Sequence, residues 1–116
     1  MDVNAVELTG RLTEIEPLRH TPAGLPLLSF RLAHNSMQLE AGYKRQVECE
    51  VRGVALGAAA AAMSRLRTGD EIRVNGFFDR KNRMSTQLVL HAMRTELLKE
   101  GNHAKTIDDE SSQSQG

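Results

Sequence analysis

Two short stretches of the sequence combine cationic side chains with groups suited to stacking or polar contacts. One stretch holds Arg80, Lys81, Asn82 and Arg83, and the other holds Tyr43, Lys44 and Arg45. Lysine and arginine neutralise phosphates, and an aromatic ring stacks on a nucleobase for about 1–3 kcal/mol. The two stretches therefore predict one electrostatic surface for a single-stranded nucleic acid. The alternatives are a solvated basic turn at the first stretch and a tyrosine packed on the edge of the fold at the second.

Catalytic and metal-binding patterns are absent from the sequence. It has no GxSxG, P-loop or HExxH motif and no paired carboxylates. The four histidines, His20, His34, His91 and His103, do not have the spacing of metal ligands. Cys49 shares strand parity with Val47 and Val51, which predicts a small buried side chain. We therefore expect no enzymatic activity, no catalytic residues, no metal and no cofactor.

Length, charge and cysteine content limit the class of protein. The chain has 116 residues, enough for one domain and too few for two. It carries 15 basic and 15 acidic residues, so net charge alone does not identify a nucleic-acid-binding protein. One cysteine fits a reducing compartment, the N-terminal residues lack the pattern of a secretory signal, and no apolar run approaches membrane-spanning length. We expect a cytoplasmic protein with no membrane partner.

Alternating apolar and polar residues predict the elements that position these side chains. The alternation predicts strands near residues 6–12, 28–33, 46–52, 71–76 and 87–92, and a helical period over 56–66 predicts a helix. Gly10 and Gly76 lie inside predicted strands, where glycine indicates a bulge or sharp bend. Phe77 and Phe78 are adjacent, so only one of them can face the core.

Three strands, a helix and two strands form the element order of an OB-fold. The predicted fold is all-β: a five-stranded OB-fold Greek-key barrel with a helix or helical loop between strands 3 and 4. An open α+β sheet is the alternative, and the glycine bends favour the curled barrel. The predicted OB-fold domain covers residues 1–100. Residues 101–116 are polar and acidic, which predicts a disordered tail.

Several segments resemble a known family when they are taken in order. The pattern LxxGDxIxVxG, from Leu66 to Gly76, together with LTGRL (8–12), PLRHTPAGLP (17–26) and FRLAHNS (30–36), resembles bacterial single-stranded DNA-binding OB-folds. The segments EAGYKRQVECE (40–50) and LVLHAMRTEL (88–97) resemble the primosomal replication protein N family more specifically. The resemblance covers residues 4–98.

The resemblance implies a homodimeric OB-fold without catalytic residues that binds single-stranded DNA in replication restart. It also implies two protein partners, the restart helicase PriA and the loader-associated protein DnaT. The resemblance matches Arg19, Tyr43 and Arg45 to DNA-binding positions of the family, and Lys44 adjoins Arg45. Arg80, Lys81 and Arg83 fall in the loop where the family carries several lysines, so all seven residues are expected to bind DNA.

Two positions depart from the family pattern. Glu48 stands where the familiar member of the family carries a stacking tryptophan, and Asn35 stands at a basic position. Both changes lower the expected affinity for a polyanion. They favour one alternative function, a protein-interaction scaffold with weak DNA binding. A general single-stranded DNA-binding protein also stays open, because such proteins resemble this chain too.

Overall fold

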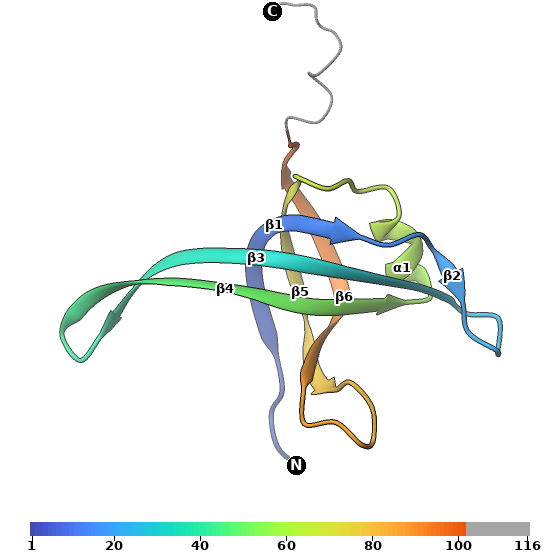
Figure 1. Ribbon diagram of the computed structural model, residues 1–116, viewed down its shortest axis with the longest axis horizontal. Coiled ribbons are helices and arrows are strands. Elements are labelled where there is room, and N and C mark those ends of the chain that lie inside the picture. Colours follow the sequence, from blue (N-terminus) through green and yellow to red (C-terminus); the bar gives the residue numbers. More distant parts are fainter. Residues whose placement is uncertain (102–116) are drawn as a thin grey trace, which may run out of the picture.

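The computed structural model describes residues 1–101, and these residues form six strands and one short helix (Figure 1). The elements are β1 (Val6–Ile15), β2 (Arg19–His20), β3 (Pro26–Glu40), β4 (Tyr43–Leu56), α1 (Ala58–Met63), β5 (Glu71–Arg80) and β6 (Leu88–Lys99). The five predicted strands and the helix occur in the predicted order. The two-residue strand β2 is additional, because the connection after β1 folds back to pair with the beginning of β3. The predicted disordered tail lies, from residue 102 onward, outside the described residues.

The sheet closes on itself through β1. Neighbouring strands follow the order β1-β5-β6-β4-β3-β2, and an additional β1–β3 pairing closes the ring. The first half of β1 pairs with β5 and its second half with β3, and the change occurs at Arg11. Strands β4 and β6 run parallel, with Gly53 opposite Leu90. This closed arrangement confirms the OB-fold barrel and excludes the open α+β sheet.

Glycines allow the strands to approach and bend where the barrel turns. A Cβ atom on Gly10 would collide with the carbonyl oxygen of Ala33, so only glycine fits where β1 crosses to β3. A Cβ atom on Gly76 would collide with the carbonyl oxygen of His91, and the β5–β6 register shifts between Asn75 and Gly76. The predicted irregularity at Gly76 is confirmed, whereas the register shift of β1 lies between Leu12 and Glu14 and not at Gly10.

The barrel interior is filled by alternate residues of the strands. Leu12, Leu28, Leu32, Ile72, Val74 and Leu90 are almost fully buried. Ala60 and Met63 of α1 pack against the same cluster. Each large aliphatic side chain contributes about 1.5–3 kcal/mol when it leaves water. This rigid interior fixes the outward-facing side chains of the same strands.

The helix is shorter than the predicted 56–66. It ends at Met63, where the Ser64 hydroxyl donates a hydrogen bond to the Ala61 carbonyl at 2.6 Å. Such a side-chain bond competes with helix continuation. The following loop is held by Asp70, which is 3% exposed and accepts hydrogen bonds from the backbone N–H groups of Arg67 and Gly101. Within residues 1–101 no helix is long and apolar enough to cross a membrane.

Strands β3 and β4 continue beyond the barrel as a two-stranded arm, which we define as residues 35–48 (left in Figure 1). Ala41 and Gly42 form its turn with φ values of 52° and 83°, as a two-residue hairpin loop requires. Most arm side chains are exposed. Cys49, at the base of the arm, is also exposed, so its predicted burial was wrong. Its face of β4 has already left the core at that point.

Candidate nucleic-acid interface

A groove of about 490 Å³ crosses the outer faces of β3, β4 and β6. The connection that contains β2 and the end of β5 bound it, through Arg19 on one side and Arg80 and Lys81 on the other. Its apolar lining residues are Leu27, Phe30, Val54, Leu56 and Val89. We call this feature the groove. An OB-fold binds oligonucleotides between these same two loops. Its binding surface lies over the second and third long strands, which are β3 and β4 in this protein.

The predicted site residues fall into two groups. Arg19, Arg80 and Lys81 line the groove, although Arg19 lies more than 60 positions away from the other two along the chain. Arg83 is exposed in the β5–β6 loop, and its backbone carbonyl accepts a hydrogen bond from the Arg80 guanidinium at 3.3 Å. The end of β5 and the β5–β6 loop therefore place three cations, Arg80, Lys81 and Arg83, close to one another.

The second group occupies the tip of the arm. Tyr43, Lys44 and Arg45 follow its turn, roughly 23–30 Å from Arg52 in the groove at the rise of an extended strand. Tyr43 is 77% exposed, so it does not pack on the barrel edge. Arg45 forms an ion pair with Glu40 at 2.6 Å. The sequence predicted one compact basic surface. The structure instead separates these residues into a groove group and an arm-tip group, and the outer face of β4 connects the two.

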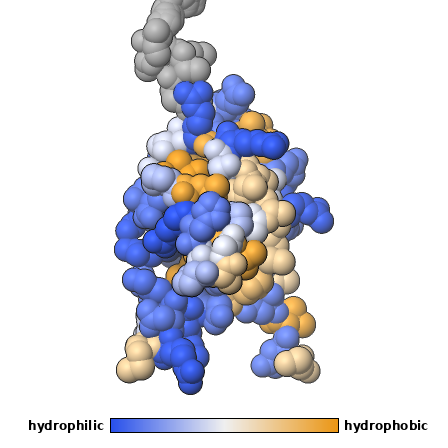
Figure 2. Space-filling model, turned by 90° about the vertical axis from the view of Figure 1, so that its right-hand side faces the viewer, coloured by the Kyte–Doolittle hydropathy of each residue, from blue (hydrophilic) through white to orange (hydrophobic). Residues whose placement is uncertain are grey.

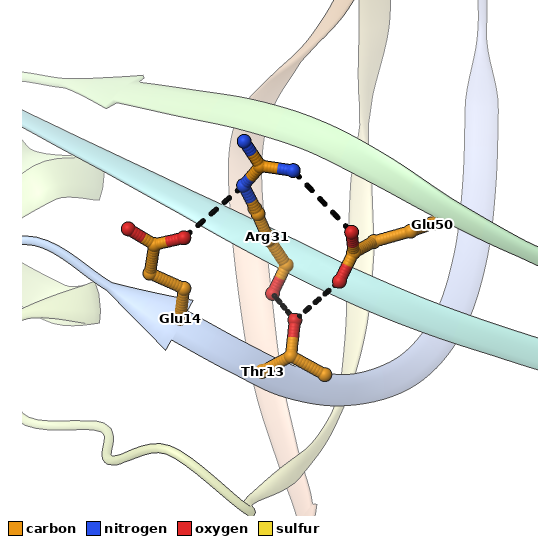
Figure 3. A network of polar contacts seen from close by, with 4 residues as sticks. All are labelled: Thr13, Glu14, Arg31 and Glu50. Atoms are coloured by element: carbon orange, nitrogen blue, oxygen red, sulfur yellow. Dashed lines mark hydrogen bonds and ion pairs between the residues drawn. The ribbon is translucent and has the colours of Figure 1, made fainter.

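Arg31 lies in the groove but its charge is largely matched by carboxylates (Figure 3). Its Nε atom lies 3.1 Å from Glu14 Oε1, and its Nη1 atom lies 3.3 Å from Glu50 Oε1. The Thr13 hydroxyl donates a hydrogen bond to Glu50 Oε2 at 2.9 Å. This network joins β1, β3 and β4, and it leaves Arg31 with less attraction for an anion than a free guanidinium has.

Sequence reasoning missed two further groove residues, Arg52 and His91. Arg52 pairs with Arg31 across the β3–β4 ladder. The His91 ring stacks on Phe77, with centroids 4.9 Å apart and planes at 8°. Phe78, the neighbour of Phe77, packs against the core instead. Outward strand parity would have marked Arg52 as a candidate, because it alternates with buried Gly53.

The departures from the family pattern lie at the base of the arm. Glu48 and Asn35 pair across the β3–β4 ladder, and both are exposed. The Gln46 side-chain amide donates to both of them, at 3.3 Å and 3.1 Å. They line a small hollow with Arg11 rather than the groove itself. The acidic position therefore lies between the two basic groups.

The groove has the features that a single-stranded nucleic acid requires, namely apolar surface for its bases and cations for its phosphates. Figure 2 shows hydrophilic side chains around most of one face, with an apolar band right of centre and a smaller apolar group near the top. A groove with an apolar floor can hold bases, and a cationic rim can hold phosphates. Within residues 1–101, no three His, Cys, Asp or Glu side chains lie close enough together to hold a metal ion.

Comparison with known proteins identifies relatives of the whole barrel. Residues 4–94 match a family described as "Another single-strand binding protein family". The chain is 39% identical to replication restart protein PriB of Nitrosomonas europaea over 95 residues, which cover 82% of this chain and 88% of that protein. It is 40% identical to PriB of Bordetella pertussis over 89 residues, which cover 77% of this chain and 83% of that protein.

Solved structures agree with the sequence relatives. The structure of PriB from Ralstonia solanacearum aligns with a TM-score of 0.76 and 31% identity, covering 83% of this chain and 98% of that one. The single-stranded DNA-binding protein of Thermus aquaticus aligns with a TM-score of 0.69 and 29% identity, covering 84% of this chain and 50% of that one. The chain therefore belongs to the replication restart protein PriB family, within the wider group of single-strand binding OB-fold proteins.

Proposed function

We propose that this protein binds single-stranded DNA in the groove as a component of replication restart. The observation that carries the proposal is the convergence of Arg19, Arg52, Arg80 and Lys81 on one groove from separate parts of the chain. That groove occupies the position where OB-folds bind oligonucleotides. The names of the relatives, replication restart protein PriB and single-stranded DNA-binding protein, support the same function.

The DNA path continues from the groove toward the tip of the arm. Lys44 and Arg52 lie on the same outward face of β4, because they are separated by an even number of residues. Glu48 and Glu50 lie between them on that face and repel phosphate. A short strand is therefore held mainly in the groove, and only a longer one reaches Tyr43 and Lys44.

The protein acts as a homodimer that bridges the restart helicase PriA and DnaT at stalled forks. This part of the proposal rests on membership of the PriB family and on exposed sheet edges. Strand β5 pairs with β1 on one side and β6 on the other. Among the described pairings, residues 6–10 of β1 pair only with β5, so this half of β1 offers an edge to a second copy. Sedimentation that shows only monomer at micromolar concentration would contradict the dimer.

A titration of labelled oligo-dT at several salt concentrations tests DNA binding and its location. The triple variant R19A/R80A/K81A removes three cations that line the groove. Each phosphate contact on a single strand contributes about −0.7 to the slope of log K against log salt. We expect the slope to flatten by about 2 and binding to weaken by more than tenfold.

A matched control separates the groove from total charge. The variant R65A/R67A/R94A also removes three exposed cations, and none of them lines the groove. We expect it to retain most of the affinity and of the salt slope. Equal losses in both triple variants would remove the groove from the DNA site. Parent protein that fails to bind oligo-dT even at low salt would favour the protein-interaction scaffold.

A further inference from the structure

The stacked pair Phe77 and His91 lies at the β5 side of the groove, and only His91 lines it. On the outer barrel surface, Phe77 pairs with His91 across the β5–β6 ladder, and His91 pairs with Val54 across the parallel β6–β4 contact. Val54 in turn pairs with Ser29 of β3. These four residues form one row across four strands. His91, Val54 and Ser29 line the groove, and Phe77 lies behind His91 at the end of the row.

The geometry of the pair leaves His91 available to a ligand. The ring planes differ by 8° and the centroids are 4.9 Å apart, which describes an offset stack and not full overlap. His91 is half-buried, so part of its surface meets solvent. Phe77 contacts it from the β5 side, and the groove lies on the β4 side. The imidazole is therefore held in place by one ring while it remains accessible from the groove.

Few other rings in the described part of the chain could serve a base in the groove. Phe30 also lines it, but this ring is only 3% exposed because it packs over Gly53 in the core. Tyr43 is at the tip of the arm. The chain contains no tryptophan. His91 is thus the groove-lining ring with accessible surface.

We propose that His91, positioned by Phe77, is the platform on which a nucleobase of the bound strand stacks. This inference rests on the proposed DNA binding in the groove. Stacking on an aromatic side chain is tolerant of sequence because every base has a π-face. Arg52, Arg80 and Lys81 border the same space and can hold the phosphates that flank the stacked base. His91 would therefore provide a stacking ring in a protein that has Glu48, and not a tryptophan, at the stacking position of the arm.

Three substitutions at His91 separate stacking from charge. His91→Ala removes the ring, His91→Phe keeps a flat ring without a basic nitrogen, and His91→Lys keeps a cation without a ring. We expect His91→Ala to weaken oligo-dT binding by about 5- to 100-fold with an unchanged salt slope. His91→Phe should bind within about threefold of the parent, and His91→Lys should not restore affinity. Phe77→Ala should give a smaller loss, because it frees the ring without removing it.

An abasic ligand series reads stacking directly. A single abasic site is moved along a short oligo-dT that fits the groove. At one position the abasic site should weaken binding to the parent protein, because the base that stacks on His91 is missing. The same abasic site should not weaken binding to His91→Ala any further, because that variant has already lost the stacking contact. Circular dichroism of each variant confirms that the barrel is folded.

The outcomes distinguish this inference from the function on which it rests. If His91→Ala binds like the parent while R19A/R80A/K81A loses affinity, the groove binds DNA and His91 is not its platform. If His91→Lys binds oligo-dT as tightly as the parent, a positive charge and not a stacking ring explains the contribution of His91, and the inference is wrong. If the parent itself does not bind oligo-dT, the proposed function fails first.

Discussion

At the scale of single residues, the ion pairs of Arg31 limit what the groove can offer to DNA. Glu14 and Glu50 both lie within 3.3 Å of its guanidinium. We expect Glu50→Gln to tighten oligo-dT binding several-fold and to steepen the salt slope by about 0.7, because Arg31 gains a phosphate and one repelling carboxylate is lost. Glutamine can still accept the hydrogen bond from Thr13. Fluorescence anisotropy over a salt series measures both effects.

The matched control for this prediction is Glu96→Gln, which removes an equivalent carboxylate. Glu96 pairs with Arg73 at 2.7 Å, and neither residue lines the groove. Its affinity and slope should equal those of the parent. If both variants tighten binding equally, the effect comes from net charge and not from Arg31.

At the scale of elements, the packing of Phe30 over Gly53 ties β3 to β4 beneath the groove. A Cβ atom at Gly53 would collide with the Phe30 ring, which is 3% exposed. We expect Gly53→Ala to destabilise the barrel by about 1–3 kcal/mol, because a filled core must shift to admit the methyl group. Urea unfolding measures the change in the free energy of unfolding.

A second variant assigns that loss to the ring. In Phe30→Leu/Gly53→Ala the smaller side chain leaves room for the new methyl group, so the Gly53 change should cost less than it does in the parent. Such non-additivity is expected for residues in direct contact. Equal costs in both backgrounds would show that the ring is not the obstacle.

The sequence predicted the elements better than their pairing. Alternation located the five long strands because the barrel buries one face of each, and Gly76 marked the irregularity in the β5–β6 pairing. It did not reveal the arm, because strands exposed on both faces have no alternation to detect. Cys49 was misplaced because the alternation of Val47, Cys49 and Val51 continues along β4 beyond the end of the core. Parity marks the groove residue Arg52 as outward-facing, but it does not show that Arg19, Arg80 and Lys81 lie around the same groove.

At the scale of the whole molecule, the arm and the barrel should be separable. The arm is mostly exposed, whereas the large buried residues all belong to the barrel and α1. Replacing residues 37–46 by Asn-Gly would close the hairpin between Ser36 and Val47 instead of Glu40 and Tyr43. The shift is an even number of residues on each strand, so the hydrogen-bond pattern at the turn is preserved. We expect the melting temperature to change by only a few degrees.

The same variant tests how far along the arm the DNA path extends. The replaced segment contains Tyr43, Lys44 and Arg45, and Arg45 is already paired with Glu40. An oligo-dT of about 8 nucleotides should therefore bind as it does to the parent, because an OB-fold groove holds roughly that length. One of about 30 nucleotides should bind more weakly, with a salt slope flatter by about 0.7–1.4 for the one or two cations lost. Equal binding of both lengths by the variant and the parent would confine the DNA site to the groove. A fall of more than about 10 °C in melting temperature would show instead that the arm packs against something in solution, and a second copy of the chain is the partner that sedimentation of the variant would then test.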